Sequence, residues 1–116
     1  MSATVLGQHK RKFLFSCAGI LSASNAYCFA EEFIALAGMK KAREGRIDPY
    51  PYNGGGGEGY TMFQPLMESY LMIDVYTDIN NTEVLLSTCK PERINLDALI
   101  NYLACRIGKV KEVGTL

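Results

Sequence analysis

The stretch 60–88 decides the fold, and it reads YTMFQPL over 60–66, MES, YLMIDVY over 70–76, TDINN, and TEVLLST over 82–88. Within 70–76, apolar and more polar side chains alternate with a period of two, which is typical of a strand with one buried face. The segment DINN, at 78–81, has the composition of a turn. The stretch therefore predicts three consecutive strands over 60–66, 70–76 and 82–88.

The N-terminal part of the chain predicts one strand, one helix and a long connection. The sequence KFLFSC at 12–17 is short, apolar and aromatic, as strands are. Over 26–41, apolar residues recur at helical spacing, and Gly45 follows as a stop signal. The segment 46–52 contains two prolines and is expected to be extended, whereas 53–59 holds five glycines and is expected to be a loop.

The C-terminal part predicts a second helix and a last strand. Asn95 or Asp97 opens the helix, an apolar stripe follows, and Gly108 ends it. A short strand over 109–113 completes the chain. This order predicts a single α+β domain over residues 1–116: a two-layer sandwich with an antiparallel-rich sheet and both helices on one face.

Composition excludes several classes of function. Lysine plus arginine equals aspartate plus glutamate, so the formal charge is zero and no nucleic-acid partner is expected. No apolar run has the length of a membrane span and no signal peptide is recognisable, so we expect a cytoplasmic protein with no membrane partner. The four cysteines are then expected to be free thiols, and the only histidine, His9, makes a metal site improbable.

A chain of 116 residues with helices on one sheet face leaves the other face partly apolar. Two copies can bury that face by stacking. We therefore expect a homodimer.

The pair Glu68-Ser69 and the thiol of Cys89 carry the chemical signal. Their setting resembles the S-adenosylmethionine decarboxylase family, in its short bacterial and archaeal form, with this chain as a divergent member. In that family the bond before the serine cleaves itself and the serine becomes a pyruvoyl cofactor. The resemblance implies a pyruvoyl-dependent carboxy-lyase of polyamine (spermidine) biosynthesis, which is made as a zymogen that cleaves between Glu68 and Ser69 and which acts on a small-molecule substrate.

The resemblance also assigns roles to other positions. Cys89 matches the catalytic cysteine, the proton donor in decarboxylation, and Thr61 matches a serine hydroxyl that assists self-processing. Asp74 stands where the family has the histidine that is the base of processing. Asp78 matches a glutamate that holds the substrate's ribose, within a Trp-Pro-Glu element that here begins at Tyr76.

Departures from the family pattern leave three functions open. Tyr70 replaces the histidine directly after the cleaved serine, Asp74 replaces the second histidine, and a glycine-rich loop replaces the aromatic residue that stacks on adenine. The first function is S-adenosylmethionine decarboxylation, and the second is decarboxylation of another amino acid, such as arginine or ornithine. The third is an unprocessed, non-catalytic homologue that acts as a binding or regulatory protein.

Each residue also has an ordinary structural interpretation. Ser69 fits a turn, Cys89 fits a buried inert thiol, and Thr61 fits a β-branched strand residue. Ser69 and Asp74 lie five positions apart, so a regular strand would place them on opposite faces. Convergence of Ser69, Thr61, Asp74 and Cys89 on one pocket therefore requires a bend, bulge or turn near 68–70.

Overall fold

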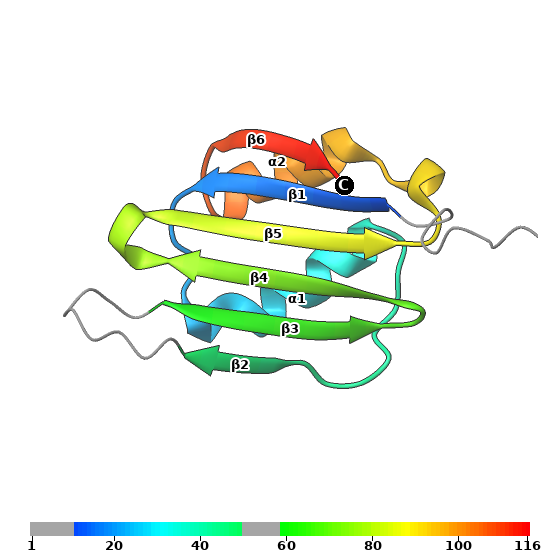
Figure 1. Cartoon of the computed structure of the whole chain (residues 1–116), viewed down its shortest axis with the longest axis horizontal. Helices are drawn as coiled ribbons and strands as arrows, with labels where there is room; N and C mark the ends of the chain where they lie inside the picture. The colour runs from blue at the N-terminus through cyan, green and yellow to red at the C-terminus, as the bar shows by residue number, and fades with distance from the viewer. Residues whose placement is uncertain (1–10, 50–58) are drawn as a thin grey trace, which may run out of the picture.

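The computed structural model describes residues 11–49 and 59–116. Its elements are, in chain order, β1 (Arg11–Ala18), α1 (Ala23–Leu36), β2 (Arg46–Pro49), β3 (Tyr60–Leu66), β4 (Ser69–Tyr76), the 3-10 helix η1 (Thr77–Ile79), β5 (Asn81–Thr88), the 3-10 helix η2 (Pro91–Arg93), α2 (Leu96–Arg106) and β6 (Val110–Thr115). The strands form one sheet in the order β2-β3-β4-β5-β1-β6 (Figure 1), and every neighbouring pair is antiparallel.

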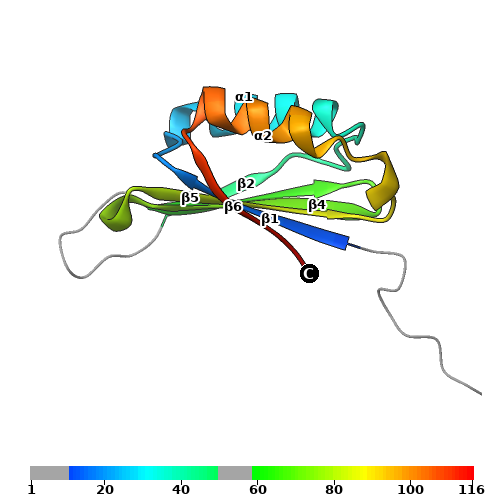
Figure 2. The same cartoon turned by 90° about the horizontal axis from the view of Figure 1, so that it is seen from above.

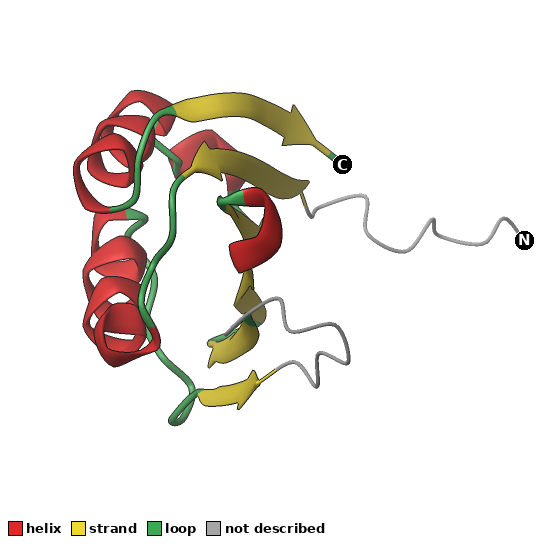
Figure 3. Cartoon of the chain, turned by 90° about the vertical axis from the view of Figure 1, so that its left-hand side faces the viewer, coloured by secondary structure: helices red, strands yellow, loops and turns green. Residues whose placement is uncertain are grey.

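Both helices lie on the same face of this sheet (Figures 2 and 3), so the predicted two-layer α+β architecture is confirmed. The alternation in β4 aims Leu71, Ile73 and Val75 at the helices, where they are fully buried. Aromatic rings fill the space between the layers, with Phe33 of α1 edge-on to Phe15 of β1 at 6.1 Å between centroids. Period-two alternation thus fixes which face of the sheet is the core.

The open face of the sheet carries an apolar row. Leu14 pairs with Leu85, Leu85 with Met72, and Met72 with Phe63, so one row crosses four neighbouring strands. All four side chains are only half-buried, because neither helix covers this face. A second layer of protein would remove them from water.

The predicted helix over 26–41 lies too far along the chain, because α1 begins at Ala23 and ends at Leu36. Gly38 adopts a left-handed conformation (φ +71°), and the Met39 N–H donates to the Ile34 carbonyl at 2.9 Å. These are the marks of a Schellman motif, in which a glycine just after the helix reverses the chain. The turn directs the following loop toward one end of the sheet.

The other elements agree closely with the sequence pattern. Strand β3 has the predicted bounds, and the Asn95 side chain caps α2 by accepting a hydrogen bond from the Ala98 N–H at 3.1 Å. The glycine-rich segment 53–59 and the extended segment 46–52 lie partly outside the described residues, and His9 lies wholly outside them. Neither α1 nor α2, the helices of the described part, is long and apolar enough to cross a bilayer.

Candidate functional site

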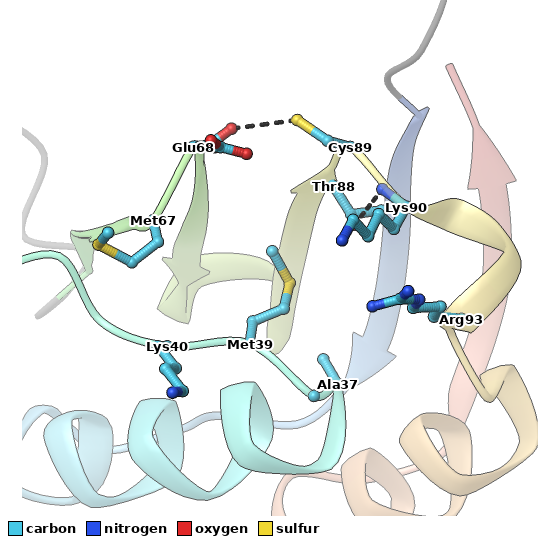
Figure 4. A pocket seen from close by; sticks show the side chains of 10 residues that line it. Ala37, Met39, Lys40, Met67, Glu68, Thr88, Cys89, Lys90 and Arg93 are labelled. Atoms are coloured by element: carbon cyan, nitrogen blue, oxygen red, sulfur yellow. Dashed lines mark hydrogen bonds between the residues drawn. The ribbon is translucent and has the colours of Figure 1, made fainter.

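A pocket of about 230 Å³ opens at the end of the sheet where β3 turns into β4 (Figure 4). Three connections enclose it: the loop after α1, the β3–β4 turn, and the segment from the end of β5 into η2. The residues that line it are Ala37, Gly38, Met39, Lys40, Met67, Glu68, Thr88, Cys89, Lys90 and Arg93. The pocket therefore joins parts of the chain that are far apart in sequence.

Backbone hydrogen bonds fix the loop after α1 against the β3–β4 turn. The Met67 N–H donates to the Lys40 carbonyl at 3.0 Å, and the Ala42 N–H donates to the Pro65 carbonyl at 3.1 Å. Two walls of the pocket are thus tied by main-chain contacts, which do not depend on the side chains present.

The tight turn between β3 and β4 places the Glu68–Ser69 bond at the pocket. Leu66 pairs with Ser69 across the hairpin, which leaves Met67 and Glu68 as the turn residues. Glu68 has φ +65°, a left-handed conformation that costs a residue with a Cβ roughly 1–2 kcal/mol. The turn strains the backbone at the bond, but it lies before Ser69, and β4 runs without a bend from Ser69 to Asp74, so the bend required near 68–70 is not present.

The thiol of Cys89 reaches the carbonyl group of the Glu68–Ser69 peptide bond. Its Sγ donates to the Glu68 backbone oxygen at 3.3 Å, and Figure 4 shows the two residues facing each other across the pocket mouth. Cys89 is partly exposed, whereas Cys17 is fully buried in the core, where burial raises the pKa of its thiol to about 11. Cys89 is thus an accessible thiol beside the bond, and Cys17 is a core residue.

The hydroxyl of Ser69 points to a neighbouring strand. Its Oγ donates to the Ser87 carbonyl of β5, and the side chain is half-buried. Attack on the Glu68 carbonyl carbon requires this bond to break and the Ser69 side chain to rotate about χ1. Ser87 is a contact that the sequence pattern did not identify, and it follows from the antiparallel pairing of β4 with β5.

Thr61 and Asp74 form a second pair, away from the pocket. They are cross-strand neighbours, and the Thr61 hydroxyl donates to Asp74 Oδ1 at 2.6 Å. Asp74 alternates with the buried Ile73 and therefore lies on the open face of the sheet, five residues along β4 from Ser69, or about 17 Å. The expected convergence of the four side chains is not met within one protomer. Asp74 is half-buried there and is not beside Ser69.

Tyr76 and Asp78 lie at the opposite end of β4 from Ser69. Tyr76 ends the strand and Asp78 lies in η1, so neither lines the pocket. Their expected role in holding the substrate's ribose therefore has no support from this pocket in a single protomer.

Three cationic residues that no sequence motif marks also line the pocket. Lys40 follows the Schellman turn, and Lys90 and Arg93 follow β5. Figure 4 shows the Lys90 and Arg93 side chains reaching toward the pocket, whereas the Lys40 side chain runs from the loop after α1 toward the helix layer and away from Glu68. Their spacing gives no sequence signal, because only the fold brings the two segments together.

Comparison with known proteins finds a similar fold among solved structures. No protein-family model matches the chain, and no curated protein matches it. Among solved structures, the crystal structure of the adenosylmethionine decarboxylase from Aquifex aeolicus VF5 aligns with a TM-score of 0.64 at 14% sequence identity. The alignment covers 92% of this chain and 86% of that chain. The chain therefore has the fold of an adenosylmethionine decarboxylase, as the sequence resemblance implied.

Proposed function

We propose that the chain is the proenzyme of a pyruvoyl-dependent decarboxylase and that it cleaves its own Glu68–Ser69 bond. The observation that carries this proposal is the hydrogen bond from the Cys89 thiol to the Glu68 carbonyl at 3.3 Å. The left-handed conformation of Glu68 at the turn and the likeness of the fold to an adenosylmethionine decarboxylase support it.

Cleavage begins at residues of this chain alone. The Ser69 Oγ attacks the Glu68 carbonyl carbon, its proton passes to the departing nitrogen, and the C–N bond breaks to leave an ester and a free amine. The carbonyl oxygen becomes negative during the attack, and the Cys89 thiol is already directed at that oxygen. The turn holds the two reacting residues next to each other, so only a side-chain rotation precedes the attack.

Elimination then separates the fragments. A base removes the Cα proton of Ser69, the Cβ–Oγ bond breaks, and Glu68 leaves as a terminal carboxylate. Water then replaces the nitrogen of the resulting enamine, ammonia departs, and a ketone remains at position 69. Such a pyruvoyl ketone supplies an electron sink for decarboxylation of an amino acid. Ser69 fits this precursor role because its backbone starts β4 directly at the strained turn.

The elimination also needs a base that takes the Cα proton of Ser69. The family resemblance offers Asp74 as this base, but Asp74 lies on the open face of the sheet, five residues along β4 from Ser69.

We propose a homodimer that stacks through the open face, which would place the Thr61–Asp74 pair at the interface. Mixing Asp74→Asn chains with Ser69→Ala chains tests whether the base comes from the partner: cleavage of the Asp74→Asn chain is then restored in the mixture.

Intact mass spectrometry tests the proposal directly. We expect two species, residues 1–68 and a fragment that begins at position 69 and carries the ketone, and a single species for Ser69→Ala. The absence of cleavage in the wild-type chain would favour the non-catalytic homologue. One observation already supports that second candidate, since the Ser69 hydroxyl donates to Ser87 rather than facing the Glu68 carbonyl.

A further inference from the structure

The pocket beside Glu68 carries an excess of positive charge. Lys40, Lys90 and Arg93 line it, against the single carboxylate of Glu68. Within residues 11–49 and 59–116, none of these three cationic side chains takes part in an ion pair or a hydrogen bond. Lys41, the next residue after Lys40, has both, which shows how a structural lysine in this loop behaves.

Unpaired cations around a concavity select ligands by charge. They raise the positive potential inside the pocket and attract anions to it. A carboxylate that enters gains charge-assisted hydrogen bonds from ammonium and guanidinium groups, which are stronger than neutral ones. A sulfonium, guanidinium or ammonium side chain would meet like charge instead.

The size and the remaining lining point to a small ligand with a short aliphatic part. The volume of about 230 Å³ lies below the roughly 300 Å³ at which pockets for drug-sized ligands begin. Ala37, Met39 and Met67 supply apolar surface between the cations. Such a lining accommodates one or two methylene groups between two charged ends.

We infer that the pocket binds a small acidic amino acid, whose second carboxylate is held by Lys90 and Arg93, while Lys40 adds positive charge at the rim. This inference rests on the proposed function for its catalytic meaning, because it makes an aspartate- or glutamate-like amino acid the substrate. Binding itself does not require cleavage. It therefore can be measured on a chain that cannot be processed.

The test uses the unprocessed Ser69→Ala chain, in which every residue that lines the pocket is unchanged. Calorimetric titrations with L-aspartate and L-glutamate are compared with L-arginine, S-adenosylmethionine and inorganic phosphate at one ionic strength. We expect an acidic amino acid to bind at least about tenfold more tightly than arginine or S-adenosylmethionine, and to weaken as salt is added. Adding Lys90→Gln and Arg93→Gln together should weaken that binding about tenfold.

A matched control removes the same charge elsewhere. Lys109→Gln with Lys111→Gln changes two exposed lysines, one just before β6 and one within it, and should leave binding within about twofold of the parent chain. Equal losses in the two double variants would overturn the inference, because net charge alone would then explain binding. No binding by either acidic amino acid, or binding by phosphate alone, would also overturn it.

Different results would refute the proposed self-cleavage and the assignment of an acidic substrate. If the wild-type chain stays whole while Ser69→Ala binds aspartate or glutamate through Lys90 and Arg93, the proposed function fails and the anionic pocket stands. If the wild-type chain is cleaved and releases carbon dioxide from S-adenosylmethionine or arginine but from neither acidic amino acid, the proposed function stands and this inference is refuted.

Discussion

Replacing Cys89 by alanine tests the site at its most specific contact. The thiol donates to the Glu68 carbonyl oxygen, which gains negative charge when Ser69 attacks. Loss of a full oxyanion donor costs about 2.7–4 kcal/mol in an enzyme. A thiol is a weak donor, and Cys89 is partly exposed to water. We therefore take about half of that range, about 1.4–2 kcal/mol, which corresponds to a 10- to 30-fold slower cleavage.

The assay follows the first step of processing in time. The chain is made in a cell-free system at low temperature, and samples are quenched with hydroxylamine, which cleaves the ester but not the peptide bond. Intact mass spectrometry then measures how fast the unrearranged full-length species falls. Cys89→Ser keeps a donor of shorter reach and should cleave within about threefold of the wild-type rate. Cys105→Ala is the matched control, because Cys105 is an exposed thiol on α2 that does not line the pocket.

Two results would refute this role of Cys89. Wild-type cleavage by Cys89→Ala would show that the thiol does not stabilise the oxyanion. A slowing of Cys105→Ala equal to that of Cys89→Ala would show that thiol loss acts through the stability of the chain. Urea unfolding of each variant separates that second case, since a donor effect on cleavage leaves the free energy of unfolding nearly unchanged.

Three further predictions concern stability and assembly. Burial raises the pKa of Tyr60 to about 12 and that of Cys17 to about 11, so the folded chain binds more protons than the unfolded chain at alkaline pH. In urea titrations the free energy of unfolding should therefore keep its highest value below about pH 9 and fall between about pH 9 and 12. The Tyr60→Phe variant should lose part of this pH dependence. Gly108→Ala would place a Cβ 1.7 Å from a backbone carbonyl oxygen of β1 and should destabilise the fold by about 3 kcal/mol or more, whereas Gly114→Ala, with nothing within 4 Å, should melt close to the wild type. Leu85→Lys puts a charge in the apolar row of the open face and should give a monomer by light scattering where the wild type gives a dimer; a monomeric wild type contradicts the proposed assembly.

Much of the fold was predictable because strand alternation is a local property. In 70–76 each side chain's face follows from its parity, and the structure buries the predicted set. The end of α1 was harder, because the apolar pattern continues to Ala37 while Gly38 already reverses the chain. Periodicity records which face is buried, but a Schellman turn depends on one glycine and two backbone hydrogen bonds.

The site was predictable only where it depends on adjacent strands. Tyr70 pairs with Ser87, so the residues just outside this pair, Glu68-Ser69 and Cys89, necessarily meet at one end of the sheet. The positions of Thr61 and Asp74 follow from the same hairpin, which pairs them with each other but on the other face. Lys40, by contrast, reaches the pocket through a loop, and no sequence period anticipates such a contact.

The pocket's cations connect the two proposed activities. Elimination at Ser69 would release Glu68 as a terminal carboxylate, and this new negative charge would form at the pocket that Lys40, Lys90 and Arg93 line. The cations that attract an acidic amino acid would therefore also stabilise the carboxylate that departs during processing. After cleavage, the main-chain bond from Met67 to Lys40 would keep the new terminus in place. The new terminal carboxylate offsets one of the three cations that line the pocket. The other two stay available to an acidic substrate only if the side-chain carboxylate of Glu68 turns toward solvent.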